Sequence, residues 1–295
     1  MTSRKSSRVD RVVQIMKLTA TRETLSLASW LVRGRMTHGR RYQALKEDDY
    51  WSPSDDQQFE AFEIGHMHIL DIGTGKGSWA VDAADRYPDA TVRGVDLYPP
   101  PISWMPPNCI FEVDDIQNDW TWEEPFDLIH LRQLLGAFTP DGWDSLYRQC
   151  FDNLKPGGWI EQVEFDIRVE SDDASLPPDS NLAQWGNIFF GCADRAGRSL
   201  KTQETMRAAI EKAGFVDVQE VLYKVPLGAW HQDPLLKETG QLHYHHWETG
   251  LEGYAVWLLS KFGAPSPWGA EEIQEFVDKT RSELNDPNIH GHEYA

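Results

Sequence analysis

The residues with the clearest chemical potential form a glycine-rich segment that follows a short apolar run. Residues 68–77 read His-Ile-Leu-Asp-Ile-Gly-Thr-Gly-Lys-Gly, so Asp71 precedes three alternating glycines, and a helix-length stretch over 78–87 follows. A buried strand that leads through a glycine turn into a helix lets a ligand approach bare backbone amides and the positive end of the helix dipole. This segment therefore predicts a ligand-binding site.

The spacing of the glycines separates two classes of ligand. Dinucleotide sites usually read G-x-G-x-x-G, with the third glycine serving close packing beside a pyrophosphate. This chain reads D-x-G-x-G-x-G instead, with Asp71 ahead of Gly73, Gly75 and Gly77. A leading carboxylate favours a cationic ligand over a pyrophosphate. A dinucleotide-dependent oxidoreductase is therefore the least favoured interpretation.

Further acids stand at the ends of two more predicted strands. Asp96 ends a β-branched run, where a carboxylate can accept hydrogen bonds from both hydroxyls of a ribose. Asp115 ends the next run and is followed by Ile116, so it could accept an adenine amino hydrogen while the isoleucine covers the ring. Asp114 could share or replace that role. Because the ends of parallel strands meet at one edge of a sheet, these groups predict a crevice for a purine nucleoside.

These groups need a framework that brings the strand ends together. Apolar and β-branched runs predict strands over residues 67–72, 91–95, 110–113, 126–131, 159–165 and 216–225. Helical spacing and turn residues predict helices over 57–63, 78–87, 143–154 and 202–213. This alternation is typical of an α/β fold, in which helices cover both faces of a parallel sheet.

The alternation stops at Pro226, after which we expect two helices, over 235–262 and 271–284, and no strand. Before that point, the acidic, proline-rich residues 170–181 are expected to form a surface excursion.

Composition narrows the classes of function. The chain of 295 residues has a formal net charge of −19, although residues 1–41 carry a net positive charge and the rest of the chain is strongly acidic. Nucleic acid is not expected as a partner, because phosphate binding needs clustered positive charge. Three widely separated cysteines predict neither a disulfide framework nor a metal site. No apolar run has the length of a membrane span, so we expect a soluble intracellular protein, cytoplasmic or nuclear. The basic leader is interpreted as a flexible tail or as a targeting or nuclear-import segment.

Motifs that match one family extend from about residue 39 to residue 284. They are the segments 39–45, 53–56, 69–82, 104–115, 126–132, 154–161 and 250–253. Together they resemble the class I S-adenosylmethionine-dependent methyltransferases and, more narrowly, the fungal LaeA-like methyltransferases of secondary metabolism. The resemblance implies a Rossmann-like fold and S-adenosyl-L-methionine as the cofactor. We predict a flexible leader over 1–41, a cofactor-binding domain over 42–225 and a helical, acceptor-side cap over 226–295.

The resemblance also implies roles for the strand ends. Asp71 would lie near the methionine moiety, the residues at 96 and 97 would hold the ribose, and those at 115 and 116 the adenine. The end of the fourth strand, from His130 to Arg132, would face the sulfonium and the acceptor. The predicted cofactor-binding residues are Asp71, Gly73, Thr74, Gly75, Gly77, Asp96, Leu97, Asp115, Ile116, His130 and Leu131.

His130 is also the candidate catalytic residue, as a general base. A base is needed only if the acceptor must lose a proton, and His130 could instead form a hydrogen bond to the cofactor. On the predicted cap helix, a second cluster could line an acceptor pocket, bind a metal or simply be solvated. It consists of His243, Tyr244, His245, His246 and Trp247. Five tryptophans could wall a pocket for a flat, apolar acceptor or pack in the core. They are Trp185, Trp230, Trp247, Trp257 and Trp268.

Two departures from the family pattern bear on activity. The family usually has a further helix-length segment between the helix at 59–65 and the first strand, whereas here Gly65 and His66 lead straight into that strand. The family also usually ends with an antiparallel strand inserted between the fifth and sixth strands, and this chain stops at 292–295, about where that strand would begin. We therefore expect the terminal strand to be missing, which would leave two strand edges unpaired.

The first functional hypothesis is an S-adenosylmethionine-dependent enzyme that methylates a small secondary metabolite at oxygen, nitrogen or carbon. The alternative is a LaeA-like regulatory or scaffold protein that binds the cofactor and acts through protein partners, or an inactive shortened form.

Overall fold

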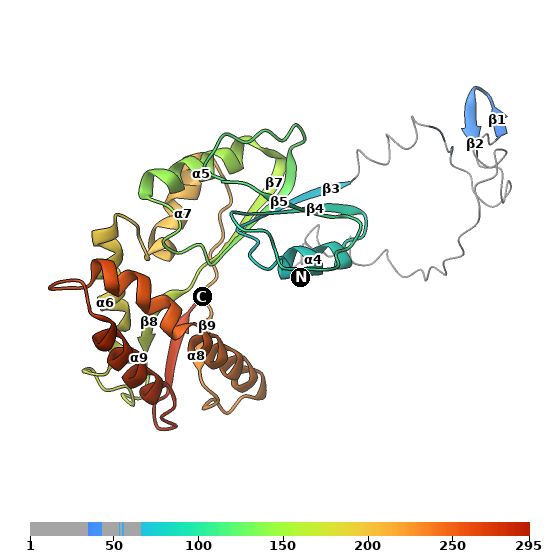
Figure 1. Ribbon diagram of the computed structural model, residues 1–295. Coiled ribbons are helices and arrows are strands. Elements are labelled where there is room, and N and C mark those ends of the chain that lie inside the picture. The colour runs from blue at the N-terminus through green and yellow to red at the C-terminus, as the bar shows by residue number, and fades with distance from the viewer. Residues whose placement is uncertain (1–34, 43–52, 54, 56–65) are drawn as a thin grey trace, which may run out of the picture. The chain divides into compact units, whose positions relative to one another are not determined.

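The computed structural model describes residues 35–42, 53, 55 and 66–295, and the chain divides into two units, Met1–Gly65 and His66–Ala295 (Figure 1). In the first unit, β1 (Arg35–Thr37) and β2 (Arg40–Tyr42) form an antiparallel hairpin. The Arg40 guanidinium donates two hydrogen bonds, of 2.6 and 2.7 Å, to the Asp55 carboxylate. Part of the predicted flexible leader is thus a hairpin. The rest of the leader and the helix predicted over 57–63 lie outside the described residues.

The second unit is built on a parallel sheet of five strands in the order β5-β4-β3-β6-β7. The strands are β3 (Met67–Ile72), β4 (Ala90–Asp96), β5 (Cys109–Val113), β6 (Phe126–Arg132) and β7 (Leu154–Val163). The first of them in sequence, β3, is central, and the order reverses on its two sides. Crevices at the carboxyl edge of such sheets open at this point, between β3 and β6. The predicted α/β sheet is confirmed.

Helices cover both faces of this sheet (Figure 1). On one face, α4 (Ser78–Arg86) packs its alanines against Ile69 of β3. On the other face, α5 (Pro140–Asp152) and α7 (Thr202–Ala213) share a core with Leu70 and Ile72 of the same strand. Successive side chains of a strand point to opposite faces, so a strand covered on both sides is apolar throughout. That is why β3 could be predicted at its observed bounds.

A second sheet of three strands corrects the expectation of a missing terminal strand. It consists of β8 (Asp166–Glu170), β9 (Lys224–Leu227) and β10 (Gly291–Tyr294), in the order β8-β10-β9. The last strand, β10, runs antiparallel to both neighbours and fills the gap between them. The expectation that no strand follows the C-terminal helices was therefore wrong. The strand escaped prediction because it is short and lacks the β-branched residues that mark strands.

The strand predicted over 216–225 is also largely wrong. Only its last residues belong to β9, and residues 215–223 form no regular element. Val216, Val221, Leu222 and Tyr223 are exposed, so the apolar run in this segment does not mark a buried strand.

Three helices pack with the second sheet around a core of their own. They are α6 (Asn181–Ala196), α8 (Pro234–Phe262) and α9 (Ala270–Leu284). Both C-terminal helices were predicted, whereas α6 was not. Its N-cap is Ser180, whose hydroxyl accepts a hydrogen bond from the Ala183 amide (3.1 Å), a signal that was present in the sequence. The core combines residues before α7 with residues after β9, so it is not contiguous in sequence. The domain boundary at 225 stays a prediction.

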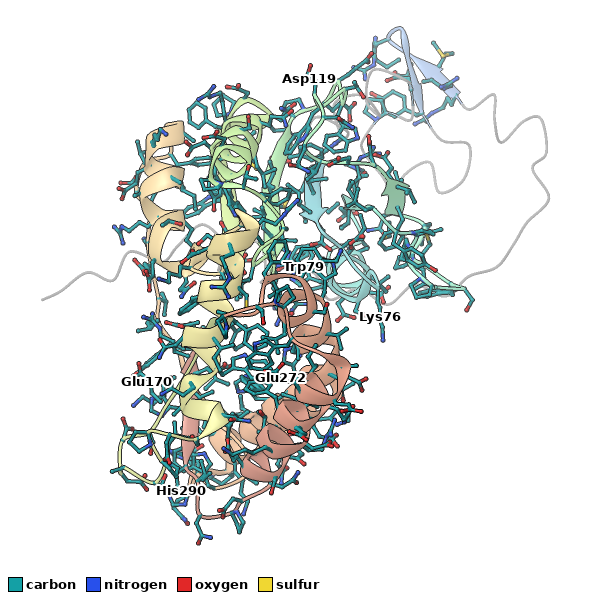
Figure 2. All side chains as sticks on the ribbon, turned by 60° about the vertical axis from the view of Figure 1, so that its left-hand side comes forward. Lys76, Trp79, Asp119, Glu170, Glu272 and His290 are labelled. Atoms are coloured by element: carbon teal, nitrogen blue, oxygen red, sulfur yellow. The ribbon has the colours of Figure 1, made fainter. Side chains whose placement is uncertain are left out.

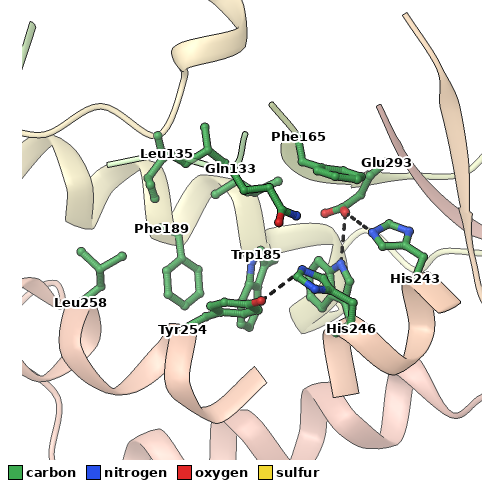
Figure 3. Close-up of a pocket in the computed structure, with 13 residues that line it drawn as sticks. Gln133, Leu135, Phe165, Trp185, Phe189, His243, His246, Tyr254, Leu258 and Glu293 are labelled. Atoms are coloured by element: carbon green, nitrogen blue, oxygen red, sulfur yellow. Dashed lines mark hydrogen bonds and ion pairs between the residues drawn. The ribbon is translucent and has the colours of Figure 1, made fainter. Parts of the chain in front are cut away.

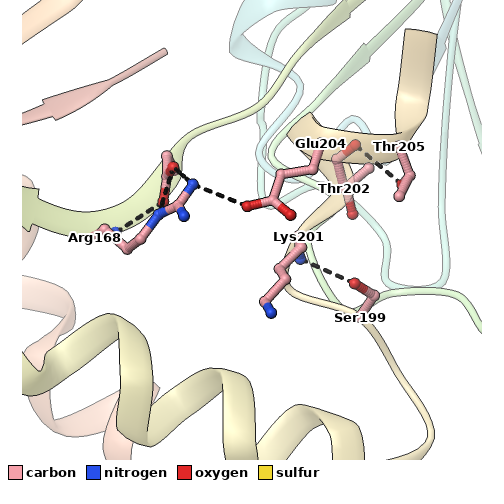
Figure 4. Close-up of polar contacts among 7 residues, drawn as sticks. Arg168, Ser199, Lys201, Thr202, Glu204 and Thr205 are labelled. Carbon is pink, nitrogen blue, oxygen red and sulfur yellow. Dashed lines mark hydrogen bonds and ion pairs between the residues drawn. The ribbon is translucent and has the colours of Figure 1, made fainter. Parts of the chain in front are cut away.

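Polar contacts connect the second sheet to the helices of the first. Arg168 of β8 forms ion pairs with Asp166 and, at 2.9 Å, with Glu204 in the first turn of α7 (Figure 4). Just before that helix, the Lys201 amide donates to the Ser199 hydroxyl (3.0 Å). These contacts fix the segment that enters α7. None of the helices in the described part of the chain combines the length and the apolar composition needed to cross a membrane.

Candidate active site

The glycine turn after β3 has a backbone that only glycine adopts readily. Gly73, Gly75 and Gly77 have φ values of +68°, +56° and +78°, all in the left-handed region. A Cβ at Gly73 would lie 2.5 Å from a methyl group of Leu134, whereas a Cβ at Gly75 would meet no atom within 4 Å. The middle of the turn therefore faces open space. Gly77 is the N-cap of α4, which places the turn at the positive end of that helix.

Asp71 is buried at the carboxyl end of β3 and is held by two side chains. Its Oδ2 accepts a hydrogen bond from the Thr74 hydroxyl (2.6 Å), and its Oδ1 lies 2.8 Å from Nδ1 of His130. Asp71 and His130 occupy paired positions on β3 and β6, so the sheet register itself brings them together. The structure thus assembles three of the predicted site residues around one carboxylate.

His130 lies in the interior rather than at the surface of a cavity. Only 2% of it is exposed, and its ring stacks on that of Trp79 in α4, with a centroid distance of 3.7 Å and parallel planes. Figure 2 shows Trp79 against the body of the unit, while the exposed Lys76 projects away from the glycine turn. This arrangement suits a residue that orients Asp71. A catalytic role for His130 stays a prediction.

The acid that ends β4 and the acids in the loop after β5 lie in segments that contact each other, and the first also contacts the glycine turn. Asp96 accepts hydrogen bonds from the Gly75 amide (2.8 Å) and the Tyr98 amide (3.0 Å). The Asp114 amide donates to the Asp96 carbonyl oxygen (3.1 Å). Asp115 accepts from the Gln117 amide (3.0 Å), which closes a local turn. The predicted ribose and adenine carboxylates are therefore brought to one edge of the sheet.

The apolar neighbours of these acids differ in exposure. Ile116 is partly buried and packs against the core of the main sheet. Leu97, directly after β4, is 72% exposed. Leu131, by contrast, is fully buried within β6 and packs in the core of the main sheet.

Glu164, which was not among the predicted site residues, fixes the loop after β6. Its Oε1 accepts hydrogen bonds from the Leu134 amide (3.1 Å) and the Gln162 side chain (3.0 Å). Its Oε2 is buried and has no hydrogen-bond partner in the described part of the chain. Burial raises the pKa of this carboxyl to about 7. Glu164 directly follows the observed end of β7, but it fell inside the strand predicted over 159–165, so the sequence did not mark it as a residue at a strand end.

A cavity of about 390 Å³ opens beside the end of β6, within the size range of small-molecule sites (Figure 3). Most of its walls are aromatic or aliphatic, and its few polar groups come from the loop after β6, from α8 and from β10. The lining residues are Gln133, Leu135, Phe165, Ile167, Trp185, Phe189, Leu200, His243, His246, Trp247, Tyr254, Leu258 and Glu293.

Comparison with known proteins places the chain in a family. A family model described as a methyltransferase domain matches residues 38–220. The protein described as methyltransferase pytC from Aspergillus terreus is 33% identical over 286 residues, covering 90% of this chain and 87% of the relative. The chain belongs to the S-adenosylmethionine-dependent methyltransferases, in the fungal LaeA-like family.

Two further relatives carry different descriptions. The secondary metabolism regulator LAE1 of Cochliobolus heterostrophus is 33% identical, with 87% of this chain and 91% of the relative covered. The protein-methionine methyltransferase laeA of Emericella nidulans is 31% identical, with 86% of this chain and 73% of the relative covered. The predicted family and enzyme class are thus confirmed. Whether this methyltransferase acts on a small molecule or in regulation is left open by these relatives.

The histidine cluster of this methyltransferase is divided between the cavity and the surface. His243, His246 and Trp247 face the cavity together, because residues three and four apart lie on one side of a helix. The His245 side chain is 75% exposed, and the Tyr244 hydroxyl donates to Asn285 (2.7 Å). Among the residues that the structure describes, no group of three or more His, Cys, Asp or Glu side chains is arranged to hold a metal ion.

The five tryptophans proposed as pocket walls are divided in the same way. Trp185 and Trp247 line the cavity and are almost fully buried. Trp257 is about half exposed, Trp230 stacks on His290, and Trp268 packs edge-on against a phenylalanine of α9. The walls contributed by Phe165, Phe189 and Tyr254 were not predicted, because no local pattern links those segments.

Proposed function

We propose that this methyltransferase binds S-adenosyl-L-methionine along the carboxyl ends of β3, β4, β5 and β6 and methylates a small planar molecule held in the aromatic cavity. The observation that carries this proposal is the hydrogen bond that the Gly75 amide donates to the Asp96 carboxylate. It joins the open glycine turn to the acid expected to hold a ribose, at the point where the sheet order reverses.

The residues at this edge fit the proposed cofactor. A ribose would bind Asp96, whose carboxylate is already oriented by two backbone amides and keeps further lone pairs for hydroxyl donors. The adenine would lie over Ile116 beside Asp115, with Asp114 as the alternative acid. The methionine moiety would lie by Asp71, where the buried carboxylate and the glycine turn leave room for a cationic group.

When bound, the cofactor supplies an electrophilic methyl group on a positively charged sulfur. The chain's contribution is mainly to align and desolvate the acceptor, since in-line displacement between two oriented groups needs little further catalysis. Gln133 and Leu135 follow β6 directly and also line the cavity, so they connect the proposed cofactor edge to the acceptor space. The buried, apolar side chains of Trp185, Phe189 and Trp247 line that space, so an acceptor bound there would be partly desolvated.

A regulatory function is the second candidate, because relatives at 30–33% identity are described as secondary metabolism regulators. In that case the cofactor site would be kept and the acceptor would be a protein. The size and the aromatic lining of the cavity favour the small-molecule proposal, because flat, apolar walls suit a planar ring system.

Calorimetric titration with S-adenosylmethionine and S-adenosylhomocysteine tests the cofactor site. We expect Asp96→Ala to weaken both affinities about tenfold or more, as removal of charge-assisted hydrogen bonds does. Asp89→Ala is the matched control, because Asp89 is exposed and lies before the opposite end of the same strand. It should leave both affinities unchanged. No binding by the folded wild-type protein would overturn the proposal.

Transfer of a radiolabelled methyl group into fungal extract then separates the two acceptor classes. Label recovered in the low-molecular-weight fraction would support a small-molecule acceptor, and label recovered only in protein would support the regulatory candidate. The Asp96→Ala variant serves as the negative control in both fractions.

A further inference from the structure

The polar end of the cavity is a buried pair formed by Glu293 of β10 and His243 of α8. Oε2 of Glu293 lies 2.8 Å from Nε2 of His243, and both side chains are almost fully buried. The Trp247 indole nitrogen donates to the same Oε2 (3.1 Å). On the other side of the imidazole ring, Nδ1 lies 3.1 Å from the Pro226 carbonyl oxygen. One carboxylate oxygen is thus held by two neighbours.

The contacts of His243 fix where the hydrogens lie. A carbonyl oxygen can only accept, so Nδ1 of His243 carries a hydrogen. The short separation between Nε2 and Oε2 of Glu293 then requires one proton between them, on either atom. The pair is therefore imidazolium with carboxylate, or imidazole with carboxylic acid. In both forms it carries no net charge, which suits its burial.

The second oxygen of Glu293 is free. Its Oε1 is buried and has no hydrogen-bond partner among the residues that the structure describes. Figure 3 shows the Glu293 carboxylate turned toward Gln133, which follows the end of β6. Buried carboxylate oxygens are almost always satisfied, so an unpaired one on a residue that lines the cavity indicates a partner on the ligand.

We infer that Glu293 is the catalytic base of this methyltransferase, and that its free oxygen receives the hydrogen of a phenol- or enol-type hydroxyl on a planar acceptor. The inference rests on the proposed function, because it places the acceptor in the same cavity. His243 and Trp247 are positioning residues, since both hold Oε2 and so present Oε1 to the acceptor.

The proposed step transfers a proton from the acceptor to Glu293 and a methyl group to the acceptor oxygen. The acceptor O–H bond breaks, and the hydrogen passes as a proton to Oε1 of Glu293 while its electron pair stays on oxygen. Attack of that oxygen on the methyl carbon forms the C–O bond and returns the C–S electron pair to sulfur, which becomes a neutral thioether. The proton stays on the Glu293–His243 pair until the methylated product leaves and water enters.

The shape of the cavity selects the acceptor class. Its walls present the flat rings of Phe165, Trp185, Phe189 and Trp247, which favour a planar, apolar ring system. Glu293 is the one carboxylate among the residues that line it. An acceptor with an acidic hydroxyl on an aromatic or enolic carbon satisfies both features. An aliphatic amine would place a further positive charge beside the imidazole without using the flat walls.

Among the other ionisable groups near Glu293, His246 is the alternative proton acceptor. His246 and Tyr254 of α8 also line the cavity and share a hydrogen bond of 3.1 Å, and Asp166 of β8 acts on Glu293 through its charge. Burial and the nearby His243 lower the pKa of His246, so this imidazole could also accept a proton. The experiment must therefore separate Glu293 from His246.

Binding of 4-nitrophenol makes this separation without requiring turnover, because its anion absorbs visible light and its neutral form does not. The probe is titrated into the full-length protein, with and without S-adenosylhomocysteine, at a pH below the pKa of the free phenol. We expect the wild-type protein to bind it as the anion. In Glu293→Gln the bound probe should stay neutral and its affinity fall about tenfold, the loss of one charge-assisted hydrogen bond.

Three further variants complete the design. Glu275→Gln removes an exposed carboxylate of α9 and should behave as wild type. His246→Gln should still bind the anion. His243→Gln keeps Glu293 in place but removes its proton partner, so the isolated buried carboxyl should become protonated and leave the probe neutral. This last variant keeps the inference testable if Glu293→Gln folds poorly.

The outcomes decide between the assignments. An anionic bound probe that persists in Glu293→Gln or His243→Gln, or that is lost only in His246→Gln, overturns the role of Glu293. Failure of the wild-type protein to bind 4-nitrophenol overturns the phenolic acceptor class. Calorimetric binding of S-adenosylmethionine is measured on the same samples, so a failed cofactor site is distinguished from a failed base.

Discussion

The two sheets of the second unit differ in how far apart in sequence the residues of their candidate sites lie. The glycine turn, Asp71 and the acids at 96 and 115 lie at or just after the ends of β3, β4 and β5, three strands that are consecutive in sequence and adjacent in the sheet. Around the second sheet, by contrast, the cavity combines residues from β8, α6, α8 and β10, segments separated by long stretches of chain. The cofactor edge thus depends on local motifs, whereas the acceptor side depends on tertiary packing.

Truncation of one buried leucine in each region tests whether the regions are energetically separate. Leu70 lies in the main-sheet core and Leu251 in the second core, and both are fully buried. We expect Leu70→Ala and Leu251→Ala each to lower the free energy of unfolding by about 2–5 kcal/mol, the cost of a cavity in a packed core. Chemical denaturation followed by tryptophan fluorescence measures this loss.

Ligand binding by the same variants, at a temperature where both are folded, sharpens the comparison. Leu70→Ala should weaken S-adenosylmethionine binding and spare 4-nitrophenol, and Leu251→Ala should do the reverse. If each variant lost both ligands to the same extent, the two regions would respond as one unit and the comparison would fail.

Glu164 lies at the border between the regions and predicts a pH dependence of stability. Its pKa is raised to about 7, so between the ordinary carboxyl pKa and pH 7 the folded state holds a proton that the unfolded state has lost. Stability should therefore fall as pH rises through that window. Glu164→Gln should remove this slope and, at pH 8, raise the free energy of unfolding by about 1–3 kcal/mol.

Denaturation between pH 4 and pH 8 measures that slope. Glu161→Gln is the matched control, because Glu161 is an exposed carboxylate on β7. It should keep the wild-type slope. If Glu164→Gln kept it too, the carboxyl would be ionised in the folded state, and the unpaired Oε2 would need another explanation.

The features that could be predicted from the sequence lie mostly around the first sheet, and those that could not lie mostly around the second. The strand Met67–Ile72 was predicted at its observed bounds because both of its faces are buried, and the acids that end β4 and β5 follow directly from their strands. The terminal strand could not be found, because β10 gains its stability from β8 and β9 rather than from its own residues. Glu293 was missed for the same reason. Its environment is made by His243 and Trp247, which no spacing rule connects to it.

The smallest expected effect concerns the ion pair between the two regions. Arg168 of β8 and Glu204 of α7 are 2.9 Å apart, and both side chains are 43% exposed. Exposed ion pairs contribute little, so Glu204→Gln should lower the free energy of unfolding by less than about 1 kcal/mol, and less still in high salt. Glu211→Gln, which removes an exposed ion pair with Arg207 within α7, is the control. A loss well above that of the control, accompanied by weaker 4-nitrophenol binding, would mean that this contact transmits strain from α7 to the cavity. The acceptor side would then depend on the first sheet through Arg168, and the separation between the two regions would have to be abandoned at that point.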